Sequence, residues 1–178
     1  MPLTQLNFTG TGLSSFPSGS ILQTQKTVIT TPFYVSLGSD TDTTVTGLTV
    51  DITPNFSNSI ILLTGQYTGE FSQPHNVVFT FFRDTTKLGQ PTRGNRNVGV
   101  MTAFNSFDGG NDDATTPDSC FFQHHDTPST TSQITYKMSA RTGATSGTSL
   151  FVNRTVNDTD DATNESGMSF IMAQEIKV

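Results

Sequence analysis

The 178-residue sequence has a single cysteine, Cys120, and no tryptophan. One thiol cannot form an internal disulfide, so packing rather than cross-linking must stabilise the fold. The N-terminal residues lack the basic region and the apolar core of a signal peptide. The longest apolar run, at residues 59–63, is too short to cross a membrane. We therefore expect neither a secretion signal nor a membrane span.

Charged residues are also scarce, at 13% of the chain, and the formal net charge is -6. Binding to nucleic acid or to an anionic membrane requires clustered positive charge. The few basic residues are scattered, and the tightest group lies between Arg93 and Arg96. The sequence therefore predicts no nucleic-acid partner and no membrane partner.

Threonine, serine, asparagine, glutamine and glycine take the place of the missing charge. Threonine is β-branched and suits a pleated, half-exposed surface. Apolar and polar residues alternate at residues 45–53 and again at 134–141, which is the period of a β-strand. About ten such segments follow one another between turn residues. We therefore predict an all-β domain at residues 20–178, a jelly-roll-like β-sandwich.

Residues 1–19 are predicted to form an extended N-terminal arm, because glycine and proline interrupt any periodicity there. Disordered tails contain few apolar residues, yet this segment contains several. Either the arm packs on its own domain, or it lies along another subunit. The candidate contact residues of the arm are Leu3, Leu6, Phe8, Leu13 and Phe16.

Two segments carry apolar side chains on both faces of the expected strand: residues 77–82, and Phe121 with Phe122. A strand of a two-layer sandwich normally has one face in water, so something must cover the second face. A loop of the same chain is one explanation. A subunit interface, where aromatic residues are enriched, is the one we favour, with Phe82 and Phe122 as the contact residues.

His124, His125 and Asp126 are consecutive, and all three residue types commonly bind metals. Neighbouring residues on a strand point to opposite faces, so the two imidazoles are not expected to share an ion. A structural zinc site needs four converging ligands, and His75 and Cys120 are the only other histidine and cysteine. We interpret the cluster as a strand end and expect no metal site and no cofactor.

Acidic residues gather in two loops, at 107–118 and 157–165. Neither loop follows the spacing of a calcium-binding EF-hand, so both are interpreted as solvated loops. Calcium at the second loop stays an alternative, because oxygen ligands are dense there. The nucleophile elbow, the phosphate-binding loop and the dinucleotide fingerprint are all missing, so we do not expect an enzyme.

Several short motifs occur in a fixed order along the chain. They are S-G-S-I-L-Q-T-Q (18–25), V-T-G-L-T-V-D-I-T-P-N-F-S-N-S-I-I-L-L (45–63), D-T-P-S-T-T-S-Q-I-T-Y-K-M (126–138), F-V-N-R-T (151–155) and S-F-I-M-A-Q-E-I (169–176). Together they resemble a family of small β-rich virion proteins of tailed bacteriophages. That resemblance implies a jelly-roll-like fold that is usually trimeric and carries no enzymatic residues. The chain departs from the family pattern at His124 and His125, where an apolar or aromatic residue is usual.

The resemblance leaves two virion roles open. The first is a capsid decoration, or cement, protein made in the host cytoplasm. It would bind the major capsid protein on the outer surface of the head as a homotrimer, with the apolar residues of the N-terminal arm as the candidate capsid-binding residues. The second is a trimeric tail-fibre or receptor-binding head that recognises a host-surface glycan or protein. A free enzyme such as a glycan hydrolase is the third and least favoured hypothesis, since fold analogy alone does not assign a function.

Overall fold

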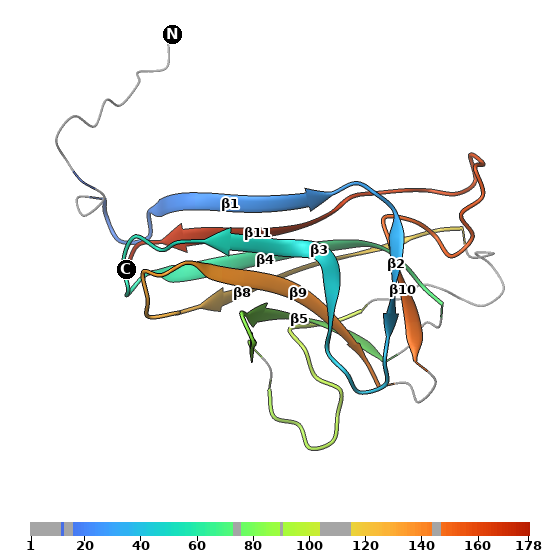
Figure 1. Cartoon of the computed structure of the whole chain (residues 1–178), viewed down its shortest axis with the longest axis horizontal. Coiled ribbons are helices and arrows are strands. Elements are labelled where there is room, and N and C mark those ends of the chain that lie inside the picture. The colour runs from blue at the N-terminus through green and yellow to red at the C-terminus, as the bar shows by residue number, and fades with distance from the viewer. Residues whose placement is uncertain (1–11, 13–15, 73–75, 90, 104–114, 144–146) are drawn as a thin grey trace, which may run out of the picture.

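The computed structural model describes residues 12, 16–72, 76–89, 91–103, 115–143 and 147–178. This part of the chain consists of β-strands and loops in two sheets (Figure 1). The strands are β1 (Ile21–Ile29), β2 (Phe33–Leu37), β3 (Thr43–Ile52), β4 (Ile60–Phe71), β5 (Val77–Arg83), β6 (Thr86–Lys87), β7 (Met101–Thr102), β8 (Asp118–Asp126), β9 (Ile134–Thr142), β10 (Thr148–Val152) and β11 (Ser169–Ile176). The predicted all-β sandwich is confirmed. None of the described residues belongs to a helix able to span a bilayer.

Sheet A has six strands, and β4 is its longest member. The first half of β4 pairs with β11, which in turn pairs with β1. The second half pairs with β10, which in turn pairs with β2. On its other side β4 pairs with β8 along residues 61–69. All of these pairings are antiparallel.

Sheet B contains β3, β9 and β5 in that order, and the short strands β6 and β7 both pair with β5. Successive long strands alternate between the two sheets, from β3 in sheet B to β4 in sheet A, then to β5, β8, β9 and β11. Such alternation is expected of a double-sheet Greek-key arrangement. It supports the jelly-roll-like description, which stays a prediction.

The core lies between the sheets and is rich in aromatic residues. Phe122 of β8 packs against Phe79 and Phe81 of β5, with ring centroids 5.7 and 4.9 Å apart. Leu48 and Ile52 of β3 are buried, as their alternation with polar residues predicts. Burying each such side chain contributes roughly 1.5–3 kcal/mol, so this layer stabilises the sandwich.

The start of the domain is tied to the end of β11. The backbone N–H of Gly19 donates to the carbonyl of Lys177 at 2.8 Å, and the Lys177 ammonium donates to the carbonyl of Phe16. Phe16 is half-buried. The other arm residues, Leu3, Leu6, Phe8 and Leu13, lie outside the described residues, so their capsid-binding role stays a prediction.

A loop of the same chain covers the outer face of β5. Gly99 lies against Val78 so closely that a Cβ atom on Gly99 would be 2.9 Å from the Val78 Cβ. Thr80, next along this face, donates from its hydroxyl to the carbonyl of Leu88 at 3.0 Å. The prediction that a subunit interface buries this face is therefore wrong for Val78. The burial of Val78 and Thr80 follows from the chain that continues after β5.

Candidate functional site

Phe121 and Phe122 point to opposite faces of β8, as predicted. Phe122 was expected on the outer face, but it is the residue that points into the core. Phe122 is only 5% exposed and belongs to the core of a single chain. Its placement at a subunit interface is therefore wrong, because its burial needs no second subunit. Phe121 is 58% exposed on the outer face of sheet A. It is Phe121, and not Phe122, that is available to a partner.

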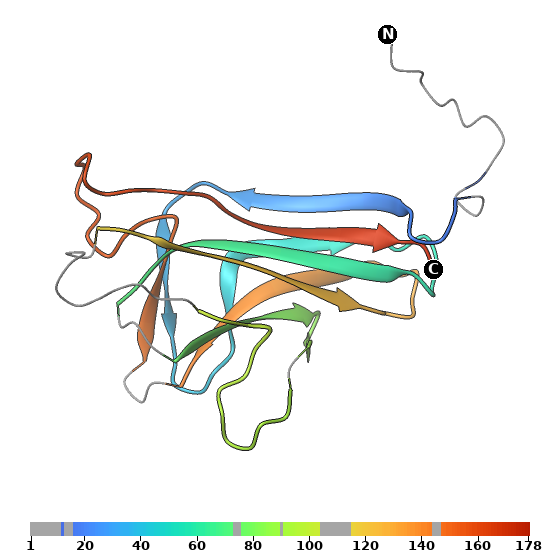
Figure 2. The ribbon, with the colours of Figure 1, turned by 180° about the vertical axis from the view of Figure 1, so that it is seen from behind.

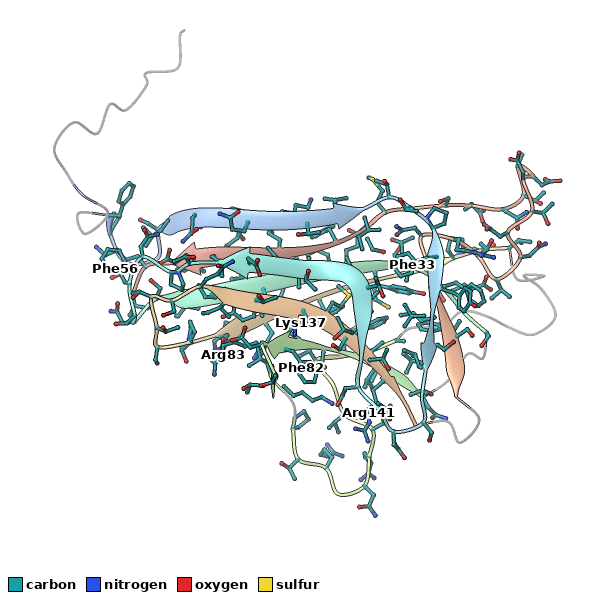
Figure 3. All side chains as sticks on the ribbon, in the orientation of Figure 1. Phe33, Phe56, Phe82, Arg83, Lys137 and Arg141 are labelled. Atoms are coloured by element: carbon teal, nitrogen blue, oxygen red, sulfur yellow. The ribbon has the colours of Figure 1, made fainter. Side chains whose placement is uncertain are left out.

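Phe82 lies on the outer face of sheet B, opposite Lys137 of β9 (Figure 3). Its side chain is half-buried, and the Lys137 ammonium donates to the nearby carbonyl of Asp84 at 3.0 Å. Phe82 is thus accessible to a partner only in part. Its role at a subunit interface stays a prediction.

The rings of His124 and His125 stack, with centroids 5.5 Å apart and planes inclined by 23°. The two residues alternate between the more buried and the exposed face of the strand, as expected, yet their rings come close enough to stack. β8 forms the outer edge of sheet A in the described structure, so both rings can turn past the backbone. The third residue of the cluster, Asp126, accepts hydrogen bonds from the Tyr136 hydroxyl at 2.7 Å and from Arg83 at 3.1 Å. Asp126 is thus held by its own chain.

Burial lowers the pKa of His124 below its ordinary value, and the neighbouring His125 lowers it further, while Asp126 opposes the shift. The ring also lies against Gly89, where a Cβ atom would come within 2.5 Å of the His124 Cε1 atom. His124 therefore closes the edge of the sandwich between β8 and the segment after β6. Across the described ranges, no three His, Cys, Asp or Glu side chains converge as metal ligands would.

The second acidic loop directs its carboxylates to its own chain. Asp158 pairs with Arg154 at 3.2 Å, and Asp161 accepts hydrogen bonds from the backbone N–H and the hydroxyl of Thr163. These hydrogen bonds lower the pKa of Asp161. The pattern is that of a capped turn in water rather than of a built cation site.

Apolar side chains gather on the outer face of sheet A where β1 and β11 pair. Val28 and Met168 are 47% and 55% exposed, and Val28 lies opposite Phe170 in the register of the two strands. Met172 follows on the same face, opposite Lys26, whose ammonium lies 4.1 Å from the centre of the Phe170 ring. We call Val28, Met168, Phe170 and Met172 the β1–β11 face.

A second exposed group lies on the ribbon of β2 and β10. Tyr34 is 61% exposed and its ring centroid is 6.0 Å from that of Phe151, directly opposite in register. The Arg154 guanidinium lies 5.1 Å from the centre of the same Phe151 ring. Hydrogen bonds to the carbonyls of Thr155 and Val156 fix this guanidinium. We call Tyr34, Phe151 and Arg154 the β2–β10 aromatic cluster.

The β1–β11 face was not among the predicted sites, although the sequence contains a signal for it. Met168, Phe170 and Met172 alternate with the buried Ile171 and Ala173, so the β11 segment is apolar on both faces. Such a segment predicts a covered second face for the same reason as residues 77–82 do.

Comparison with known proteins adds no assignment. No protein-family profile matches the chain. A search of curated proteins likewise returns no significant match.

Proposed function

We propose that the chain is a structural protein of a bacteriophage virion that assembles as a homotrimer through the β1–β11 face. The ordered motifs supply the virion part of this proposal. The observation that carries the assembly part is that the exposed Val28 and Met168 adjoin the half-buried Phe170 and Met172 at the β1–β11 pairing. Exposed apolar clusters that include aromatic residues and methionine are typical of the centres of protein interfaces.

The free energies of burial and association require several apolar side chains at this interface rather than one. Burying an apolar side chain of this size contributes roughly 1.5–3 kcal/mol. Association costs roughly 4–15 kcal/mol in lost translational and rotational freedom. Phe170 and Met172 are already half-buried, so each of them contributes only part of this value. The four side chains of each subunit together offset part of the association cost, which one side chain cannot do. A trimer closed by rotation buries the same face on every subunit.

Light scattering on purified protein tests the assembly. We expect dilute wild-type protein to have the mass of a trimer, and Val28→Asp combined with Phe170→Ser to lose that trimer without unfolding. Tyr34→Ser is the matched control, because it removes an exposed aromatic side chain outside the β1–β11 face. A wild-type protein that stays monomeric at high concentration would contradict the proposal.

We place the trimer on the outer surface of the head, bound to the major capsid protein through the N-terminal arm. The sandwich has its own core, so deleting residues 1–17 should leave a soluble β-rich protein. Co-sedimentation with undecorated heads should then capture the full chain and not the truncated one. Equal sedimentation of both proteins would remove the arm from the mechanism.

The β2–β10 aromatic cluster favours a second candidate function, the receptor-binding head of a tail fibre. An exposed ring beside a fixed guanidinium can stack on a sugar and hydrogen-bond its hydroxyls. In that case Tyr34→Ala should abolish binding to host-cell glycans, and neither the full chain nor the truncated one should bind heads.

A further inference from the structure

Strand β8 is an edge strand of unusual length and regularity. Its nine residues pair with β4 in an uninterrupted register from Asp118 to Asp126. Within the described structure, no strand pairs with its other side. An exposed edge of this kind is a template for another strand.

The other edges of the two sheets carry the features that normally prevent such pairing. β1 has a register shift near Ile21 and carries Lys26, and β3 has a register shift between Thr44 and Thr49. β2 spans five residues and follows Pro32, and β6 and β7 have two residues each. The β8 segment, D-S-C-F-F-Q-H-H-D, has no shift, proline, lysine or arginine. Its charged residues, Asp118 and Asp126, lie at its two ends, so the middle of the β8 edge carries none of these protective features.

The hydrogen bonds of β4 show which backbone groups of β8 face outward. Thr68 of β4 uses its N–H and C=O on the side away from β8, to Ser169 and Asn153. The neighbours of Thr68 along β4 point the other way at every second position and therefore hydrogen-bond to β8. Their partners on β8 include Cys120 and Phe122.

The residues of β8 that alternate with Cys120 and Phe122 point their N–H and C=O groups away from β4. These outward residues are Ser119, Phe121, Gln123 and His125. Their side chains share the outer face of sheet A, on which Phe121 is the most exposed. A row of four donors and four acceptors thus borders an exposed aromatic ring.

We propose that β8 pairs antiparallel with β8 of a second copy of the chain about a two-fold axis at Phe121, so that two copies of sheet A become one continuous sheet. In this register Phe121 lies opposite its symmetry mate, and Ser119 lies opposite Gln123. Cross-strand aromatic pairs stabilise a sheet.

The aromatic contact selects this register over its neighbours. An axis at Phe122 would place Phe121 opposite Gln123, and an axis at Gln123 would place Phe121 opposite His125. Only the axis at Phe121 pairs the two exposed aromatic rings directly.

This contact goes beyond the proposed trimer, because it uses the β8 edge and not the β1–β11 face. A two-fold contact is self-complementary and joins one subunit to one other. On a shell of trimers it would connect neighbouring trimers into a network.

Register-specific disulfide formation tests the proposal. In a Cys120→Ala background, Phe121→Cys, Ser119→Cys and Gln123→Cys each place one thiol on the outward positions. Opposed residues of a hydrogen-bonded pair have Cα atoms about 5.5 Å apart, within the range that a disulfide spans. Mild oxidation followed by a non-reducing gel should show dimers for Phe121→Cys alone, and for a mixture of Ser119→Cys with Gln123→Cys.

The two single variants at 119 and 123 should stay monomeric on the gel. If Phe121→Cys forms no more dimer than Tyr34→Cys, the pairing is wrong. Strong dimer formation by Gln123→Cys alone would overturn this register. The Val28→Asp, Phe170→Ser protein should still cross-link through Phe121→Cys, which separates this contact from the trimer.

Two further variants test the edge without a thiol. Phe121→Pro removes an outward N–H while leaving the bonds of Cys120 and Phe122 to β4 in place, and Phe121→Lys keeps the N–H but places charge on the edge. Each should weaken the two-fold association roughly tenfold or more by sedimentation, with an unchanged β-sheet spectrum. Wild-type association in a folded Phe121→Lys protein would overturn the proposal.

Discussion

The carboxylate of Glu175 accepts a hydrogen bond from the backbone N–H of Asn55 at 2.7 Å, across 120 residues of sequence. The side chain is fully buried and also accepts hydrogen bonds from Phe56, Ser59 and Gln23. Burial raises the pKa of Glu175, but these hydrogen bonds outweigh it and hold the pKa below its ordinary value of 4.5. One carboxylate therefore fastens the turn between β3 and β4 to β11.

Glu175→Gln should lower the free energy of unfolding by about 1.5–3 kcal/mol at neutral pH, the usual contribution of hydrogen bonds to a charged group. Because the folded-state pKa is depressed, the wild-type advantage is complete above pH 4.5 and is lost as the pH falls through the folded value. Denaturant titrations at neutral and acidic pH should therefore converge for the two proteins. A constant difference at every pH would show that the carboxylate charge is irrelevant.

Gly89 and Gly94 form a matched pair, since both have φ of +60°. Alanine at either position carries the same left-handed backbone cost of about 1–2 kcal/mol. At Gly89 the new methyl group also meets the His124 ring, whereas at Gly94 it meets open space. Gly89→Ala should thus destabilise the protein by about 1–3 kcal/mol more, measured by denaturant unfolding. Adding His124→Ala should remove part of the difference, and equal effects at both glycines would contradict the contact.

Tyr136→Phe should cost about 1–3 kcal/mol of stability, because it removes the hydrogen bond that the hydroxyl donates to the buried Asp126. Burial and then this hydrogen bond raise the pKa of Tyr136 well above its ordinary value of 10.0. Wild-type stability should therefore fall as the pH rises above 10, and less so in the variant. Tyr34→Phe, at an exposed ring, is the control and should change stability little.

Chelators should leave the melting temperature unchanged, because Asp126 is bound by Tyr136 and Arg83 and because two stacked imidazoles supply too few ligands for a structural ion. Calorimetry with and without a chelator measures this directly. A fall of several degrees that His125→Ala eliminates would show that the histidines bind a metal after all.

Most of the strands can be predicted from the sequence because the alternation of apolar and polar residues matches the alternation of buried and exposed side chains. Ile134, Tyr136, Met138 and Ala140 share one face of the alternating segment, and all four are buried. Of the segment that leads into β7, only Met101–Thr102 forms a strand, although Val100 and Ala103 on either side also donate backbone hydrogen bonds to β5.

The candidate surfaces were harder to predict than the strands. Alternation requires Phe121 and Phe122 to face in opposite directions, but it does not say which direction is the core. That choice depends on partners distant in sequence, here Phe79 and Phe81. The stacking of His124 on His125 depends in turn on β8 being an edge strand, which only the pairing order reveals.

The position of β11 has a consequence for synthesis of the chain. β11 lies between β1 and β4 (Figure 2), so the strand that joins them leaves the ribosome after both. Until then β1 and β4 each have an edge that lacks its final partner. The nascent chain is most prone to misassembly in this interval, when the first half of the chain has been synthesised and β11 has not. Sheet A can therefore be completed only after residues 169–176 have been translated.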